Sequence, residues 1–229
     1  MRAEEIVYPS IYSADQLFLY DELRRVEKAG YKILHIDIQD GVFCSNLSFG
    51  MKVVKGLRKY TSMPFQVHLQ VMDPMSYIYQ LKDIPNICEI IFHPSVEAYP
   101  GRVINTIKDM GIEAGFALTP TEPLEELQYY KGRIKSMLLW TSEADNRGAA
   151  FDINSLQKIK RTRNLFGKDL LIYTDGGINS QNLSLVLEAG ADGFVMGREI
   201  FDSEDILVKT EELNEIFLRK SYIKPIRRG

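Results

Sequence analysis

Residues 33–41 read ILHIDIQDG, a short run of branched apolar side chains that ends in polar residues and an Asp-Gly turn. Residues 89–93 (EIIFH) and 193–197 (GFVMG) are built in a similar way. Strands that are covered on both faces have this near-continuous apolar character, and parallel sheets are made of them. The three stretches therefore predict buried strands of a parallel sheet.

Similar stretches recur along the whole chain, and consecutive expected strands begin 22 to 35 residues apart. One strand-helix unit of an eight-stranded α/β barrel takes roughly 30 residues. No linker or low-complexity stretch divides the chain, so we predict one (β/α)₈ TIM barrel over residues 1–218 and a basic C-terminal tail over residues 219–229. The expected strands begin near Val7, Ile33, Phe65, Cys88, Glu113, Lys135, Leu170 and Asp192.

Helical patterns fill the intervals between these strands. Residues 13–16 (SADQ) have the form of a capping box, in which two side chains satisfy the first backbone N–H groups of a helix. Apolar residues within 19–26 then share one helix face, and Gly30 marks the end. A second helix is expected between Asn179 and Gly190.

The composition excludes several classes of protein. Of the 229 residues, 45% are apolar and 26% are charged, the ordinary mixture of a globular protein with a full core. The 28 basic and 31 acidic residues give a net charge of −3, without the basic stripe of a nucleic-acid-binding protein. No apolar run approaches the roughly 18 residues of a membrane span, and the first residues do not form a secretory signal. We therefore expect a cytoplasmic protein that binds neither nucleic acid nor membrane, with Cys44 and Cys88 unbridged.

The C-terminal tail over residues 219–229 is rich in basic residues. Two interpretations stay open: a solvated, frayed terminus, or a segment that acts as a lid or an interface. Its basic residues are Arg219, Lys220, Lys224, Arg227 and Arg228.

Polar side chains stand at the ends of several predicted strands, where a barrel carries its active site. Because strand side chains alternate with a period of two, His35 and Asp37 share one face, as do His68 and Gln70. If that face is the barrel interior, two imidazoles and two carboxylates converge, and this donor set suits zinc, iron(II), manganese or cobalt. The strand-end residues are Ser10, His35, Asp37, His68, Gln70, His93 and Asp175.

Each of these residues has a simpler explanation on its own. A single strand histidine is usually a satisfied core residue, and Asp-Gly is most often only a turn. Four such groups at matching strand ends are harder to explain in this way, because burying two carboxylates and two imidazoles without a metal or substrate is costly. We therefore predict one divalent metal ion per chain.

The loops after the seventh and eighth strands read DGGIN (175–179) and GREI (197–200). Barrels often bind phosphate with these two loops and the N-terminus of a short extra helix, where glycine lets backbone N–H groups approach an anion. The alternative is that the glycines only form turns and the arginine lies on the surface. The predicted phosphate-binding residues are Gly176, Gly177, Gly197 and Arg198.

These motifs resemble the ribulose-phosphate 3-epimerase family in the same order along the chain. Residues 9–15 (PSIYSAD) resemble its PSILSAD. Residues 35–43 (HIDIQDGVF) resemble HxDIMDGxF, and residues 46–50 (NLSFG) continue that motif. Residues 67–70 (VHLQ) stand where the family has CHLM.

The later part of the chain continues the resemblance. Residues 92–98 hold the His and the Glu-Ala of the family's HxEA strand end, with a two-residue insertion. Residues 117–120 (ALTP) match ALNP loosely, and residues 174–178 (TDGGI) match VDGGI. The resemblance thus covers nearly the whole chain and implies a barrel of the ribulose-phosphate-binding type.

The resemblance also implies a reaction and residue roles. His35, Asp37, His68 and Asp175 match the family's metal ligands, and the two aspartates match its acid/base pair. The implied reaction removes one proton from C3 of a ketose phosphate and returns another on the opposite face, through an enediolate. Family members are often dimers or hexamers, so the resemblance implies a homo-oligomer, although no feature of the sequence fixes the number of subunits.

The sequence departs from the family at the walls of the expected substrate site. Gln39, Gln70 and Trp140 stand where the family caps its intermediate with methionines. The sixth-strand loop, usually EPGFGGQ, reads EADNRGA over residues 143–149, and Arg198 follows Gly197 where the family has serine. We expect the metal-binding and proton-transferring residues of the family to be retained, while the residues that line the substrate site differ. The expected substrate-binding residues are Ser10, Gln39, His68, Gln70, Trp140, Arg147 and Gly148.

The leading hypothesis is a metal-dependent 3-epimerase of a ketose phosphate, with the conversion of D-ribulose 5-phosphate to D-xylulose 5-phosphate as the default. An epimerase of another ketose phosphate, such as D-allulose 6-phosphate, is the alternative. A barrel decarboxylase or a Schiff-base aldolase fits less well, because an aldolase needs an inner strand lysine and the expected strand ends supply none. A sugar-phosphate-binding barrel without turnover would not need both aspartates.

Overall fold

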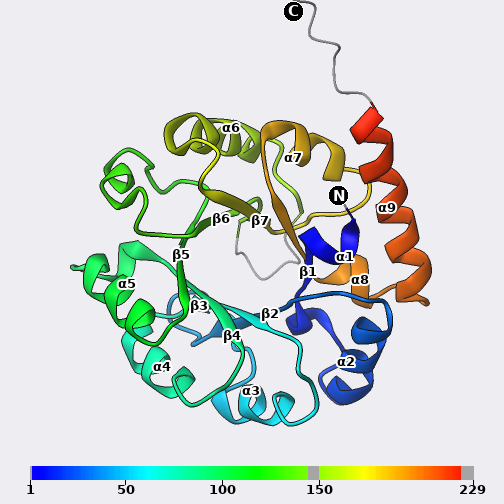
Figure 1. Cartoon of the computed structure of the whole chain (residues 1–229), viewed down its shortest axis with the longest axis horizontal. Helices are drawn as coiled ribbons and strands as arrows, with labels where there is room; N and C mark the ends of the chain where they lie inside the picture. Colours follow the sequence, from blue (N-terminus) through cyan, green and yellow to red (C-terminus); the bar gives the residue numbers. More distant parts are fainter. Residues whose placement is uncertain (1, 144–149, 223–229) are drawn as a thin grey trace, which may run out of the picture.

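The computed structural model describes residues 2–143 and 150–222, the last three by their backbone only. Within these ranges, parallel strands pair in the order β1-β8-β7-β6-β5-β4-β3-β2. A parallel bridge between Ser10 and His35 joins the two ends of this sheet. Figure 1 looks along the resulting barrel. The strands are β1 (Val7–Pro9), β2 (Leu34–Gln39), β3 (Phe65–Gln70), β4 (Ile87–Phe92), β5 (Glu113–Leu118), β6 (Ser136–Trp140), β7 (Leu171–Asp175) and β8 (Gly193–Met196).

Helices surround the barrel on its outside (Figure 1). Among the described helices, none is long and apolar enough to cross a membrane. The helices are α1 (Ala3–Ile6), α2 (Leu19–Lys28), α3 (Met51–Leu57), α4 (Pro74–Leu81), α5 (Pro100–Asp109), α6 (Ser155–Phe166), α7 (Leu183–Ala189), α8 (Arg198–Phe201) and α9 (Ile206–Tyr222).

The predicted (β/α)₈ barrel is confirmed, and each expected strand start lies within one residue of the observed one. The predicted boundary at residue 218 falls inside α9, which continues to Tyr222. Arg219 lies in this helix and its guanidinium is 3.0 Å from Glu215 Oε2. Lys220 also lies in α9, whereas residues 223–229, with Lys224, Arg227 and Arg228, lie outside the described part of the chain.

The start of α2 is a correction to the sequence analysis. Residues 13–16 do not cap a helix, because Ser13 closes a 3₁₀ turn over Ile11–Ser13 and α2 begins only at Leu19. The Gln16 amide instead donates to the carbonyls of Tyr12 and Ala14. The Gln16 side chain therefore stabilises a local turn and does not cap α2.

The connection between β5 and β6 also differs from the regular pattern. Instead of an α-helix it contains a 3₁₀ helix over Glu126–Tyr130. Pro120 and Pro123 stand at the start of this connection, and proline opposes a continued helix because it lacks a backbone N–H group. A short 3₁₀ helix therefore takes the place of the α-helix in the fifth strand-helix unit.

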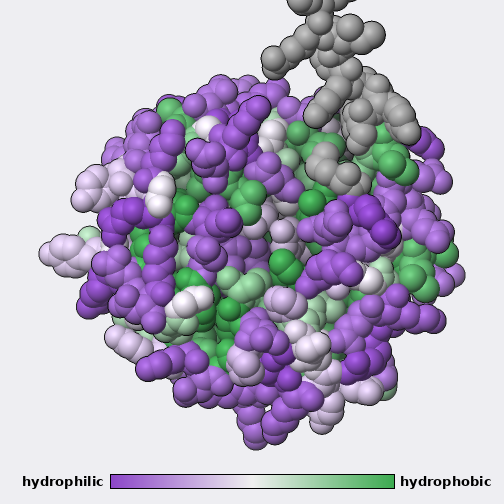
Figure 2. Space-filling model, viewed as in Figure 1, coloured by the Kyte–Doolittle hydropathy of each residue, from purple (hydrophilic) through white to green (hydrophobic). Residues whose placement is uncertain are grey.

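The apolar side chains form two clusters that alternate along the strands. The larger one fills the space between the sheet and the helices, with fully buried side chains such as Phe65 and Leu23. The smaller one includes Ile91, Leu138 and Val195, whose neighbours along each strand belong to the larger cluster, so it lies inside the barrel. In Figure 2 the visible face is mostly hydrophilic, with hydrophobic residues in small separate groups. Cys44 and Cys88 are free, as expected.

Candidate metal centre and active site

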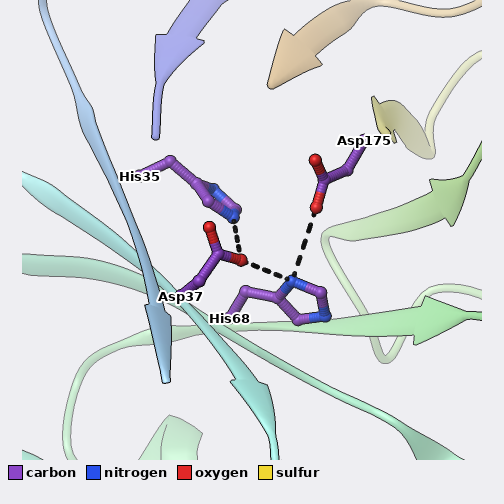
Figure 3. Close-up of side chains that lie close together, drawn as sticks. All are labelled: His35, Asp37, His68 and Asp175. Atoms are coloured by element: carbon purple, nitrogen blue, oxygen red, sulfur yellow. Dashed lines mark hydrogen bonds and ion pairs between the residues drawn. The ribbon is translucent and has the colours of Figure 1, made fainter. Parts of the chain in front are cut away.

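The four predicted metal ligands come together inside the barrel from three of its strands. β2 contributes His35 and Asp37, β3 contributes His68, and Asp175 is the last residue of β7. Each offers one ligand atom, and these atoms lie within 4.8 Å of one another. Figure 3 shows the side chains pointing toward a common centre.

Asp37 connects the other members of the cluster. Its Oδ1 lies 3.3 Å from His35 Nε2 and 3.2 Å from His68 Nδ1. Asp175 Oδ2 lies 3.8 Å from the same His68 nitrogen. Ser10 Oγ donates a hydrogen bond of 2.5 Å to Asp37 Oδ2. One oxygen of Asp37 therefore faces the histidines, while the other is held by a hydroxyl group.

This set of side chains fits a divalent metal ion. Imidazole nitrogens and carboxylate oxygens are ligands that zinc, iron(II) and manganese share. His35 Nε2 is buried and has no hydrogen-bond partner among the described residues, which is a costly state for a polar atom unless a ligand binds it. His35, Asp37 and His68 are buried, whereas Asp175 is partly exposed. The cluster can therefore hold a metal with one side open to a substrate.

Burial and mutual charge separate the pKa values of the four groups. Burial lowers the pKa of His35, but the nearby charge of Asp37 outweighs burial and raises this pKa to about 9. Burial lowers the pKa of His68 to about 4. Burial raises the pKa of Asp37, but the two histidines outweigh it and hold this pKa well below the usual range. Burial and the charge of Asp37 raise the pKa of Asp175 to about 7. Two neighbouring carboxyl groups thus differ in their readiness to hold a proton, which is typical of acid/base pairs.

A pocket of about 500 Å³ adjoins the cluster and includes Asp37 and Asp175 in its wall. The predicted substrate-binding and phosphate-binding residues of the described ranges line it, except His68, which is fully buried behind it. Arg147 and Gly148 lie outside the described residues. The predicted residues in the wall are Ser10, Gln39, Gln70, Trp140, Gly176, Gly177, Gly197 and Arg198.

The wall positions where the sequence departs from the family form a polar chain. Gln70 Nε2 donates to Asp37 Oδ1 at 2.8 Å, and Gln39 Nε2 donates to Gln70 Oε1 at 2.8 Å. Gln39 Oε1 and Trp140 Nε1 are buried and have no partner among the described residues. One unsatisfied acceptor and one unsatisfied donor are therefore buried in residues of the pocket wall, beside the candidate metal centre.

The two glycine loops meet at another part of the same wall. Gly176 and Gly177 have φ values of +113° and +68°, in the left-handed region that favours glycine. Gly197 packs against the Ser13 side chain, where a Cβ atom would collide. Arg198 is exposed, lines the pocket and begins α8. The loops after β7 and β8 thus bring backbone N–H groups and one guanidinium to the pocket.

The sequence analysis gave no role to His93, which follows β4 and is fully buried. Its Nε2 lies 3.1 Å from His68 Nε2, and Glu122 Oε2 lies 3.8 Å from its Nδ1. The ring also lies against Phe43, with the ring centroids 4.3 Å apart. The strand-end position of His93 was the available signal. Further pocket residues come from loops whose course the sequence does not reveal, and these include Tyr12, Ser13, Asn46, Ser142 and Asn179.

Fold and site together define a (β/α)₈-barrel enzyme with a candidate metal centre at the carboxyl ends of its strands. The model of the ribulose-phosphate 3 epimerase family matches residues 6–201. The chain belongs to this family, whose members are isomerases that act on carbohydrates.

Curated relatives agree with this membership. The chain is 34% identical over 224 residues to a ribulose-phosphate 3-epimerase of Methanocaldococcus jannaschii, covering 93% of this chain and 94% of the relative. It is 35% identical over 204 residues to the Bacillus subtilis ribulose-phosphate 3-epimerase, covering 87% and 93%. The Escherichia coli K12 protein of that name is 31% identical over 221 residues, covering 95% and 98%.

Solved structures show the same fold at low sequence identity. A tryptophan synthase α-subunit from Pyrococcus furiosus superposes with a TM-score of 0.68 at 13% identity, covering 94% of this chain and 98% of the other. A thiamine phosphate pyrophosphorylase from Pyrococcus furiosus gives 0.63 at 15% identity, covering 95% and 98%.

Proposed function

We propose that the protein is a metal-dependent ketose-phosphate 3-epimerase that interconverts D-ribulose 5-phosphate and D-xylulose 5-phosphate. The observation that carries the proposal is the pair Asp37 and Asp175, which reach one histidine cluster from β2 and β7. The relatives named above are ribulose-phosphate 3-epimerases and support the choice of substrate.

The two carboxyl groups divide the proton transfer. At neutral pH Asp37 is ionised, because the histidines hold its pKa low. It is therefore ready to accept the proton on C3 of the substrate, which leaves an enediolate. On the opposite face Asp175 returns a proton to C3; burial and the charge of Asp37 raise its pKa to about 7, so it can take up and release a proton near neutral pH. The C3–H bond that breaks and the one that forms have opposite stereochemistry, and the reverse reaction exchanges the roles.

A divalent metal bound by His35, Asp37, His68 and Asp175 would supply Lewis-acid polarisation of the substrate carbonyl. The chain itself holds Asp37 in place through Ser10 and Gln70. Fixed hydrogen bonds of this kind cost no reorganisation during the reaction.

The polar wall suggests which substrate groups are recognised. Gln39 Oε1 can only accept a hydrogen bond, and Trp140 Nε1 can only donate one. Two such atoms favour a hydroxyl-rich substrate. They also support a second candidate, the 3-epimerisation of a hexulose phosphate such as D-allulose 6-phosphate.

We further propose that Gly176, Gly177, Gly197 and Arg198 bind the phosphate. They lie together in the pocket wall, where backbone N–H groups and a forked cation suit that anion. Arg147 and Gly148 stay predictions for the same substrate.

A solvent-exchange experiment tests the proposal. Metal-reconstituted protein is incubated in D₂O with D-ribulose 5-phosphate, D-allulose 6-phosphate and other ketose phosphates, and deuterium at C3 is followed by NMR. We expect incorporation into D-ribulose 5-phosphate with formation of D-xylulose 5-phosphate. Deuterium incorporation only into D-allulose 6-phosphate would identify that compound, instead of D-ribulose 5-phosphate, as the substrate. Metal binding without exchange into any ketose phosphate would overturn the enzymatic assignment in favour of a binding protein.

A further inference from the structure

Three neighbouring strands carry a chain of buried polar side chains on the amino-terminal side of the metal cluster. His35 on β2 stands opposite Gln66 on β3, which stands opposite Glu89 on β4. Gln66 Nε2 donates to Glu89 Oε2 at 2.7 Å, and Gln66 Oε1 lies 2.8 Å from His35 Nδ1. All three side chains are buried inside the barrel. The proton transfer described above uses neither Gln66 nor Glu89.

The surroundings of Glu89 are shaped to hold a carboxyl group. Its second oxygen, Oε1, accepts a hydrogen bond from the Ser136 hydroxyl. Gly115 leaves the space open, since a Cβ atom there would lie 3.1 Å from Glu89 Oε1. A buried carboxyl group is costly unless it is hydrogen-bonded, and both of these hydrogen-bond partners are neutral. Simple packing would be served better by an apolar side chain, so the position of Glu89 calls for another explanation.

The hydrogen bonds fix the orientation of the whole chain. Gln66 turns its NH₂ group toward Glu89, whose ionised carboxylate can only accept a hydrogen bond. The Gln66 carbonyl then faces His35 and can likewise only accept, which requires a proton on His35 Nδ1. In the neutral ring this leaves the lone pair on Nε2, the atom that faces Asp37 at 3.3 Å and has no hydrogen-bond partner in the described part of the chain.

We propose that Glu89 and Gln66 are positioning residues that hold His35 in the tautomer able to bind the metal through Nε2. Metal-bound histidines generally donate their other N–H group to a fixed acceptor, and loss of such an acceptor weakens metal binding about 10- to 100-fold. Here the acceptor is an amide, and the carboxylate behind it prevents the amide from turning round. The inference rests on the proposed metal centre but not on the identity of the substrate.

The test measures Zn²⁺ affinity by competition with a chromophoric chelator, independently of activity. Gln66→Met removes the acceptor for His35. Glu89→Gln keeps the size of the side chain but offers an NH₂ group that lets Gln66 turn round. Both variants should bind Zn²⁺ about tenfold more weakly or worse. If Gln66→Met does not fold, Glu89→Gln carries the test.

Two controls separate positioning from general stability. Ser136→Ala removes the hydrogen bond to the other oxygen of Glu89, and Glu113→Gln removes an exposed carboxylate opposite it on β5. Both should keep the wild-type Zn²⁺ affinity, even where the melting temperature falls. In ¹⁵N spectra of the Zn²⁺-loaded wild type, His35 Nδ1 should carry a proton.

Each outcome decides a separate question. Unchanged Zn²⁺ affinity in both Gln66→Met and Glu89→Gln would overturn the inference, as would a bare Nδ1 on His35 in the loaded wild type. A wild-type protein that binds no Zn²⁺, Mn²⁺ or Co²⁺ would instead overturn the metal centre itself.

Discussion

His68 lies between the two carboxyl groups of the site, with Nδ1 3.2 Å from Asp37 and 3.8 Å from Asp175. We expect His68→Ala to lose most of the bound metal and nearly all turnover, because one of four ligands is removed and the carboxylates are left uncompensated. Elemental analysis of the reconstituted protein measures the occupancy. The matched control is His93→Ala, which removes a buried histidine that contacts neither carboxylate and should keep more of the metal. Full occupancy in His68→Ala would refute its assignment as a ligand.

Asp37 and Asp175 are expected to act as separate acid/base groups. Asp37→Asn and Asp175→Asn should each abolish epimerisation, because an amide cannot take or return the C3 proton. Either variant can still exchange one substrate proton with solvent slowly, because one carboxyl group remains. Epimerisation is followed by coupled assay and proton exchange by NMR in D₂O. Near-normal turnover in either variant would show that a single base suffices.

At the scale of the elements, the loops after β7 and β8 are expected to hold the phosphate. Hydrogen bonds to charged groups contribute about 1.5–3 kcal/mol, so Arg198→Ser should raise KM for a ketose phosphate roughly tenfold or more. The value of kcat should change less, because the phosphate is distant from C3. An unchanged KM would mean that Arg198 does not bind the phosphate and that other groups hold it.

Arg163 joins α6 to the segments that lead into β7 and β8. Its guanidinium donates to the carbonyls of Gly190 and Leu170 at 2.9 Å each, to the Gly167 carbonyl, and to the Asp192 carboxylate. We expect Arg163→Ala to lower the free energy of unfolding by about 2–4 kcal/mol, because several partly buried carbonyls lose their donor together. For a chain of this size the melting temperature should fall by roughly 5–15 °C.

The control for Arg163 lies two residues earlier on the same helix. Arg161 pairs with Glu125 at the surface, and its side chain is 64% exposed. Exposed pairs contribute little, so Arg161→Ala should change the stability by about 0.5 kcal/mol or less. Equal melting temperatures for the two variants would contradict the role assigned to Arg163.

The strands could be predicted closely because most of them are nearly continuous apolar runs. Periodicity placed His35, Asp37 and His68 on the inner face, and the structure brings them together. The start of α2 could not be predicted in this way, since Ser13 lies in a 3₁₀ turn and Gln16 binds local carbonyls, which the capping pattern alone does not reveal. A local sequence pattern therefore predicts the existence of a helix or strand more reliably than it predicts the residue at which that element begins.

The side-chain contacts inside the barrel could not be predicted from the sequence for another reason. Alternation places Gln66 and Glu89 inside, but only the strand register sets them opposite His35. Likewise, the Gln39–Gln70 hydrogen bond depends on side-chain conformations that no local pattern determines. The candidate ligand set was thus predictable from strand ends, while the residues around it were not.

At the scale of the whole molecule, metal binding should stabilise the fold. A ligand that binds only the folded state adds about 2.7 kcal/mol when its free concentration is 100 times the dissociation constant. The apolar core does not depend on the ligands, so chelator-treated protein should stay folded with a lower melting temperature. Re-addition of Zn²⁺ should restore the original value, as measured by circular dichroism. A metal-free protein that is unfolded would show that the core alone is insufficient.

The size of this stabilisation should depend on pH, because the metal competes with protons. Asp175 has a folded-state pKa raised to about 7 by burial and by Asp37, and the pKa of His35 is raised to about 9, chiefly by Asp37 against the effect of burial. Raised pKa values stabilise the metal-free fold at low pH, and this contribution is lost as pH rises through 7 and then 9. Zn²⁺ must therefore displace about two protons below pH 7 and about one between pH 7 and 9.

The gain in stability from Zn²⁺ should shrink by about 2.7 kcal/mol for each pH unit that the pH is lowered below pH 7, and by about half as much per unit between pH 9 and 7. Melting curves with and without Zn²⁺ between pH 5.5 and 8 measure this slope. In Asp175→Asn, the pH dependence of this Zn²⁺-induced stabilisation below pH 7 should fall to the slope expected for one displaced proton. A Zn²⁺-induced stabilisation that does not change with pH would rule out His35 and Asp175 as ligands.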